Sequence, residues 1–255
     1  MKNPTAPIVV ALFVLFASSA WAQTALPYDI TMSANLGVAS DYRYRGISQT
    51  NRKPAFQGGF DFAHKSGFYL GNWNSNVDSA MYNGANLEMD FYGGYKGAWS
   101  AFSYDAGLLY YDYPGSGAGG TTRIDNTELY VGGGWGPVSL KVSYAVSDFF
   151  GAQDSKGAYY LDGSVAFALT KALSLVAHLG YQGNLKNGAR VTEIDGSGPH
   201  RSITDWKLGA SYDAKGWLLG ASVIGTDRKL SAGTAAIGRR NISGEALLLS
   251  VTRSF

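Results

Sequence analysis

The stretch PVSLKVSYAVS, Pro137 to Ser147, alternates apolar and mostly small polar side chains at every step. One side of this extended segment carries Val138, Leu140, Val142, Tyr144 and Val146, and the other carries Ser139, Lys141, Ser143, Ala145 and Ser147. Successive side chains of a β-strand point to opposite faces. A period of two therefore predicts a strand with one apolar and one polar face.

The same alternation recurs along the chain and predicts an all-β protein with about twelve strands. Most runs are long enough to cross a bilayer as tilted strands, which takes about 9–11 residues. The predicted strands lie near residues 30–44, 55–63, 67–76, 86–95, 101–112, 126–135, 137–147, 158–169, 173–182, 204–212, 216–225 and 245–255.

The links between these runs alternate in length. Long polar links such as GISQTNRKP and PGSGAGGTTRID follow the odd strands, whereas tight turns such as HKSG and WGP follow the even strands. Short periplasmic turns and long extracellular loops are typical of a transmembrane antiparallel β-barrel. A soluble β-sandwich would also alternate, but its strands average about 5–6 residues. Aromatic residues near both ends of the strands further favour a barrel between two lipid headgroup layers.

Both chain ends indicate export to an outer membrane. The apolar run IVVALFVLFASSA followed by AWA, Ala20 to Ala22, predicts a signal peptide over residues 1–22 and a mature barrel over 23–255. The last strand ends in EALLLSVTRSF, and a terminal Phe255 on an alternating strand resembles the signal read by the barrel-assembly machinery. We therefore expect the bacterial outer membrane as the location, with outer-membrane lipid and lipopolysaccharide as partners.

Composition excludes several classes of protein. Without Lys2, the 21 basic residues become 20 against 19 acidic ones, so the mature chain is nearly neutral and no nucleic-acid partner is expected. The chain has no cysteine, which rules out disulfides and cysteine-ligated metals.

The stretch SDYRYRGISQT, Ser40 to Thr50, alternates tyrosines with arginines. We interpret it as the end of the first strand, with Tyr42 and Tyr44 facing lipid and Arg43 and Arg45 facing the lumen. An arginine that faced lipid at mid-depth would cost about 2–4 kcal/mol, and the inward assignment removes that cost.

The inward faces of the other strands collect further charges, with acids in excess. The predicted interior residues are Asp41, Asp61, Glu88, Asp90, Asp105, Glu128, Asp162, Asp205, Arg43, Arg45, Lys141, Lys207 and His178. Buried charges need either water or pairing. Because twelve strands enclose more space than the eight whose interior side chains can fill, we expect a narrow, wet passage.

These features predict a passive outer-membrane porin for small hydrophilic solutes. Arg43 and Arg45 would oppose carboxylates such as Glu88, Asp90 and Glu128, and the lumen charges would set a mild cation preference. The alternative is a non-conducting barrel, structural or a receptor, that works through its long loops at 183–203 and 226–243. The second of these loops could also fold inward and narrow the pore.

Two weaker patterns do not change this interpretation. Gly115, Gly117 and Gly120 have dinucleotide-binding spacing, but they lie in a loop between antiparallel strands instead of between a strand and a helix. None of the three histidines, His64, His178 and His200, has an evident serine and acid that would complete a hydrolytic triad. We therefore predict no catalytic residue, no cofactor and no metal.

The run from Val38 to Asp78 resembles the TorF-like porins, bacterial outer-membrane proteins of unknown function. SDYRYRGISQ, PAFQGGFDF and GFYLGNWNSNVD carry the resemblance, which continues through LEMDFYGGY and GLLYYDYPG to the terminal Phe255. It implies an outer-membrane location and a porin role, with the solute open.

Overall fold

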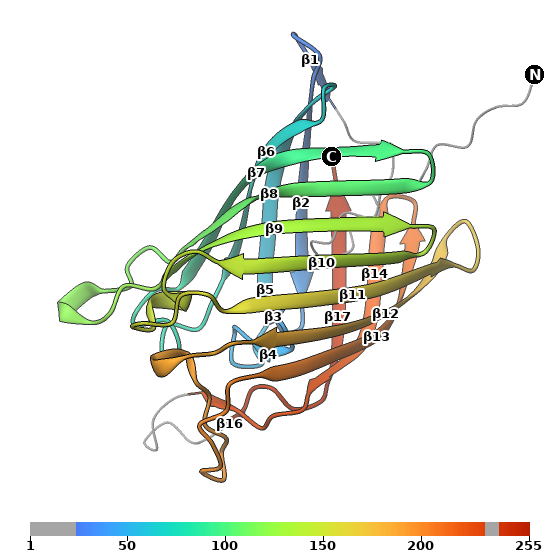
Figure 1. Cartoon of the computed structure of the whole chain (residues 1–255). Coiled ribbons are helices and arrows are strands. Elements are labelled where there is room, and N and C mark those ends of the chain that lie inside the picture. Colours follow the sequence, from blue (N-terminus) through green and yellow to red (C-terminus); the bar gives the residue numbers. More distant parts are fainter. Residues whose placement is uncertain (1–23, 233–239) are drawn as a thin grey trace, which may run out of the picture.

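Long antiparallel strands, each bonded to its neighbours in chain order, form a closed β-barrel in the computed structural model (Figure 1). The structure describes residues 24–232 and 240–255, so the predicted signal peptide at 1–22 lies outside the described residues. Within the described ranges, no helix is long and apolar enough to cross a membrane.

The barrel wall in the described residues has twelve strands, as the alternation predicted. They are β2 (Ile30–Ala39), β5 (Ala55–His64), β6 (Phe68–Asn76), β7 (Leu87–Trp99), β8 (Phe102–Asp112), β9 (Asp125–Trp135), β10 (Val138–Ala145), β11 (Tyr159–Ala168), β12 (Leu173–Gly183), β13 (Ile203–Ala214), β14 (Trp217–Thr226) and β17 (Ala246–Ser254). The short elements are β1 (Thr24–Leu26), β3 (Arg43–Tyr44), β4 (Ile47–Ser48), β15 (Ser231–Ala232), β16 (Arg240–Asn241) and the 3-10 turns η1 (Ala118–Gly120), η2 (Phe149–Gly151) and η3 (Asn187–Ala189).

The barrel closes where its first long strand meets its last. Strand β2 pairs antiparallel with β17 through Val38 and Val251, and with β5 on its other side. The backbone of Phe255 is bonded in both directions to Ala34, with N to O distances of 2.7 and 3.0 Å. Figure 1 shows β1 and the C-terminus at the end with the short turns, and the longer loops at the opposite end.

The two faces of the wall reverse the arrangement of a soluble protein. Outward leucines and valines are exposed, for example Leu140 at 64% and Val131 at 58%, whereas inward Glu128 and Asp205 are only 1% and 2% exposed. Soluble proteins bury their large apolar side chains and expose their charges. An apolar exterior around a polar interior is the arrangement of a transmembrane barrel, and it decides against the sandwich.

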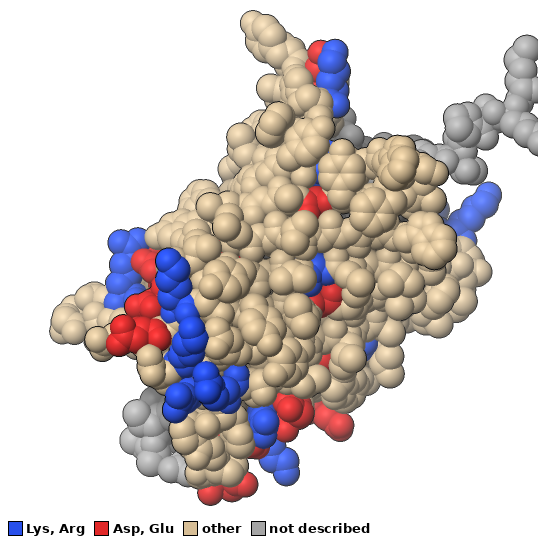
Figure 2. Space-filling view, viewed as in Figure 1, with Lys and Arg blue, Asp and Glu red and all other residues tan. Residues whose placement is uncertain are grey.

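Charged side chains gather at the long-loop end, and the wall between the two ends is almost free of them (Figure 2). Exposed aromatic residues border this wall, with Trp99, Trp135 and Trp217 toward the short turns. Tyr144 and Tyr181 lie toward the long loops. The two borders fit the headgroup layers on either side of a bilayer.

The first strand is shorter than predicted, and two tyrosines do not face lipid. Strand β2 ends at Ala39 instead of continuing to residue 44. Tyr42 is only 7% exposed and its ring centroid lies 5.4 Å from that of Trp73. The ring of Tyr44 lies 5.7 Å from those of Tyr111 and Phe150. The chain turns into the barrel here, so the tyrosines pack against interior residues.

Candidate functional site

Residues 41–50 form what we call the inward hairpin, in which β3 pairs with β4 inside the barrel. A tight turn at Arg45 and Gly46, with φ of 48° and 80°, reverses the chain. At its tip Gly46 is so close to the wall that a Cβ there would lie 2.4 Å from Thr226 and 2.7 Å from Asp205. Glycine is the residue that accepts both this φ and this approach.

Asp41 and Arg43 brace the base of the inward hairpin. Arg43 Nε donates to Asp41 Oδ2 at 2.6 Å, and Arg43 Nη1 donates to the carbonyl of Ile242 at 2.8 Å. The hydroxyl of Ser48 donates to the other carboxylate oxygen of Asp41 at 2.5 Å. Both side chains lie inside the barrel, where they are buried in contacts that hold the hairpin to the segment before β17.

Arg45 joins the tip of the hairpin to the barrel wall. Its Nη2 donates to both carboxylate oxygens of Glu128 on β9, at 2.9 and 2.7 Å, and its Nη1 donates to Gln182 on β12. The guanidinium lies between the rings of Tyr44 and Tyr160, 4.6 and 4.3 Å from their centroids. The side chains of Arg45 and Glu128 are 8% and 2% exposed. A cation with this many partners fixes the tip within the lumen.

Two acids on β7 lie beside the hairpin without a cation. Glu88 and Asp90 are 1% and 4% exposed. The hydroxyl of Tyr42 donates to Glu88 at 3.1 Å, and Asp90 Oδ1 has no hydrogen-bond partner among the described residues. Within residues 24–232 and 240–255, neither Glu88 nor Asp90 takes part in an ion pair. Four interior acids thus form no ion pair among the described residues, namely Glu88 and Asp90 on β7, Asp61 on β5 and Asp105 on β8.

The predicted residues Asp61, Asp105 and Lys141 also face the interior. Tyrosine hydroxyls bond both acids, Tyr92 donating to Asp61 at 2.7 Å and Tyr69 to Asp105 at 2.6 Å. The ammonium of Lys141 lies 4.1 Å from the centroid of the Tyr130 ring.

The sequence interpretation missed Lys96 and Gln182 as interior residues. Lys96 is the register partner of Asp105 and lies 5.0 Å from the ring centroid of Tyr69. Its even position on β7 matches that of Glu88 and Asp90, so the period of two could have identified it. Gln182 shares its parity with His178 in the same way.

His178 lies between two carboxylates. Its Nε2 is 3.0 Å from Asp205 and its Nδ1 is 3.3 Å from Asp162, with Ser164 Oγ 3.1 Å from Nδ1. Lys207 is its register partner on β13. This corrects the expectation that His178 lacks a serine and an acid nearby. The arrangement still differs from a hydrolytic triad, because a carboxylate lies beside each ring nitrogen and the Ser164 hydroxyl donates to Asp162 at 3.1 Å.

The long loops meet over the inward hairpin at what we call the mouth cluster. Its buried side chains are Ala145, Ala158, Leu185, Ile203, Leu230 and Ile242, and Ile47 of the hairpin packs against them with Met81 and Phe149. The backbone joins the same loops, since Ser48 N donates to Ile242 O at 2.8 Å and Asp78 N donates to Gln49 O at 2.9 Å. The long-loop end of the interior is thus narrowed by several loops.

Glu193 ties together the two long loops, through residues 193–200 of one and 228–229 of the other. It accepts from the backbone N of Lys229 at 2.8 Å and from Arg228 at 3.4 Å, and it lies 3.1 Å from His200. The Lys229 N–H is the largest cause that lowers the pKa of Glu193, and Arg228 adds to it. Because the folded pKa is lowered, this contact is present at neutral pH and is lost as the pH falls through that pKa.

Comparisons with known proteins place the chain among bacterial β-barrels. The family model described as "Bacterial protein of unknown function (Gcw_chp)" matches residues 22–255. No curated protein matches. A solved structure titled "KdgM porin" superposes with a TM-score of 0.54 at 14% identity, over 88% of this chain and 99% of that one. A structure of the NanC porin gives 0.56 at 11% identity, over 87% and 98%. Identities this low show a shared fold alone.

Proposed function

The chain belongs to the Gcw_chp family of bacterial proteins of unknown function, and we propose that it is an outer-membrane porin for small hydrophilic solutes, narrowed by its inward hairpin. The fold is that of outer-membrane channels. The observation that carries the proposal is Arg45, held across the interior against Glu128 and Gln182. The resemblance to TorF-like porins points the same way, as does the sequence evidence for export, and no catalytic role is proposed.

The charges of the interior favour cations over anions. Arg43 neutralises Asp41 and Arg45 neutralises Glu128. His178 neutralises one of the two acids that it contacts, and Lys207 lies in register beside it. Glu88 and Asp90, like Asp61 and Asp105, form no ion pair among the described residues, and carboxylates along a pore favour cations.

The acids on β7 also distinguish this barrel from one solved relative. That structure is titled "KdgM porin in complex with disordered oligogalacturonate". Oligogalacturonate is a polyanion, and uncompensated Glu88 and Asp90 would repel one. We therefore propose neutral or cationic small solutes for this chain.

A Glu88→Gln/Asp90→Asn double variant is expected to reduce the cation preference, because it removes two of the interior acids that form no ion pair while keeping the side-chain volumes. The reversal potential in a KCl gradient across a planar bilayer should move toward zero. Asp195→Asn, which neutralises an exposed loop acid, is the matched control and should keep the wild-type value. An unchanged reversal potential in the double variant would contradict the proposed selectivity.

The packing of the mouth cluster favours a second candidate, a barrel that does not conduct and acts through its loops. Recording in a planar bilayer distinguishes the two candidates, since a porin should give discrete single-channel steps and a non-conducting barrel should insert without any current.

Deletion of residues 228–240, part of which lies outside the described residues, removes Leu230 from the mouth cluster. We expect the deletion to raise conductance if that loop narrows the pore. Silent insertion of both proteins would favour the loop-based role.

A further inference from the structure

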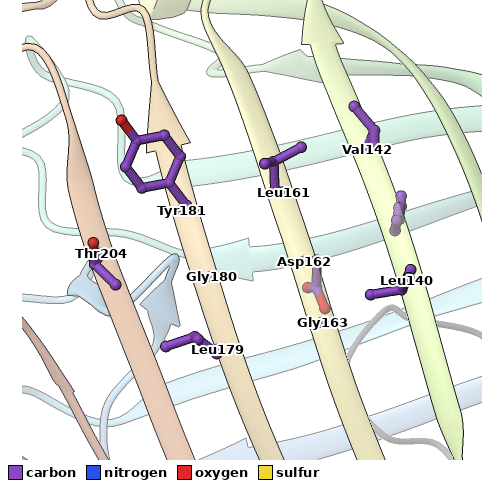
Figure 3. A pocket seen from close by; sticks show the side chains of 10 residues that line it. Leu140, Val142, Leu161, Asp162, Gly163, Leu179, Gly180, Tyr181 and Thr204 are labelled. Atoms are coloured by element: carbon purple, nitrogen blue, oxygen red, sulfur yellow. The ribbon is translucent and has the colours of Figure 1, made fainter.

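The outer face of the wall carries an apolar groove of about 470 Å³ where β10, β11, β12 and β13 run side by side (Figure 3). We call it the glycine groove, and its main lining residues are Leu140, Val142, Leu161, Gly163, Leu179 and Tyr181. Leu140 and Leu179 are 64% and 61% exposed, so the groove opens outward, to the side of the membrane.

A single glycine creates the groove. Gly163 pairs with Leu140 on one side and with Leu179 on the other, in one row across the wall. A Cβ at Gly163 would lie 3.4 Å from Leu140 and 3.8 Å from the Leu179 carbonyl, which is ordinary contact. The site can therefore take a side chain, and its absence leaves a hollow between two leucines.

The groove ends beneath an aromatic border and two cations. Toward the long loops, the row of Gly163 is followed by a row of Val142, Leu161 and Tyr181. In the row after that, Tyr144 pairs with Tyr159. Beyond them Lys186 Nζ donates to the carbonyl of Lys156 at 3.3 Å. A Cβ at Gly157 would lie within 3.5 Å of both Lys186 Nζ and the Tyr144 hydroxyl, so the ammonium stands directly above this border.

These cations are free to meet an anion at the membrane surface. Among the described residues, neither Lys156 nor Lys186 belongs to an ion pair. An apolar groove below the aromatic border, with a cation that forms no ion pair above it, matches a lipid that combines an acyl chain with a phosphate. We propose that the glycine groove holds one acyl chain of lipopolysaccharide, with a phosphate of the same molecule at Lys186.

This inference rests on the proposed outer-membrane location, because lipopolysaccharide occupies the leaflet at the long-loop end. It does not rest on conduction, since the groove lies outside the lumen. Variants in the groove should leave single-channel conductance unchanged, so a silent wild-type barrel would count against the porin and not against the lipid site.

The test is native mass spectrometry of the purified barrel in detergent, titrated with diphosphorylated lipid A. The wild-type protein should bind one lipid A more tightly than any further copy. Gly163→Leu fills the groove and should weaken that binding about tenfold. Lys186→Ala removes the phosphate contact and should weaken it about fivefold. Dephosphorylated lipid A should bind wild-type protein as weakly as diphosphorylated lipid A binds the Lys186→Ala variant.

The matched control is Gly93→Leu, at another outward glycine, where an added Cβ meets nothing closer than 3.2 Å. It should bind lipid A like the wild type, and heat-modifiable migration on gels checks that all three variants are folded. Equal lipid A binding by the Gly163→Leu and Gly93→Leu variants would overturn the site. Displacement of lipid A by an equal concentration of phosphatidylglycerol would overturn the choice of lipopolysaccharide.

Discussion

An Arg45→Ala variant is expected to conduct several-fold more current than the wild-type barrel. The substitution removes the guanidinium that lies between Tyr44 and Tyr160 and frees the tip of the inward hairpin from Glu128 and Gln182. It also leaves Glu128 buried without its cation. Losing one partner of a buried pair typically costs about 3–5 kcal/mol, and water entering beside a displaced hairpin would relieve that cost. Single-channel recording in planar bilayers measures the change.

Two further variants separate charge from position. Arg45→Lys keeps the positive charge but cannot make the same set of contacts, so its conductance should lie between wild type and Arg45→Ala. Lys53→Ala breaks an exposed pair with Asp78 at the end of the same loop, and exposed pairs contribute about 0–1 kcal/mol. It should conduct like the wild type. If Arg45→Ala also conducts like the wild type, the hairpin does not limit passage.

A Val131→Arg variant is expected to lose about 2–4 kcal/mol of barrel stability, the cost of an arginine that faces lipid at mid-depth. Val131 lies near the middle of β9 and is 58% exposed on the outer face. Urea titration of the barrel folded in phospholipid vesicles measures the loss.

Thr127→Arg is the depth control for that experiment. It lies on the same strand and has the same parity as Val131, but near the long-loop end. The cost of an arginine falls to about 0–1 kcal/mol near the membrane interface. Equal costs at the two positions would mean that this face of β9 does not meet hydrocarbon.

The wall could be predicted from the sequence because its signal is local. Each strand reports its own two faces through a period of two, so Leu140 and Lys141 are assigned to opposite sides without any knowledge of their neighbours. The alternation of link lengths then fixes which end carries the long loops. Neither step needs a contact between residues far apart in the chain.

The inward hairpin could not be predicted in this way. Tyr42 and Arg43 continue the alternation of β2, so the pattern does not reveal that the strand ends at Ala39. What turns the chain inward is a set of distant contacts, such as Arg43 with Ile242 and Arg45 with Glu128. The parity rule placed both arginines inside the barrel, but on a strand instead of a hairpin.

The surroundings of His178 show the same limit. The alternation within each strand placed His178, Asp162 and Asp205 on the inner face. It did not show which residues of neighbouring strands pair with one another. The pairing of Ser164 with His178 across β11 and β12 is what brings a serine to the imidazole. Only the assembled sheet shows that two carboxylates also reach it.

The central claim is that apolar side chains face lipid while their polar neighbours face a wet interior. Because the chain has no native cysteine, single cysteines at the adjacent positions Leu140 and Lys141 test both faces at one depth. In liposomes, a small water-soluble thiosulfonate should modify Lys141→Cys and leave Leu140→Cys unreacted, while a lipid-soluble maleimide should modify Leu140→Cys. Rapid reaction of Leu140→Cys with the aqueous reagent, and protection of Lys141→Cys from it, would contradict the account.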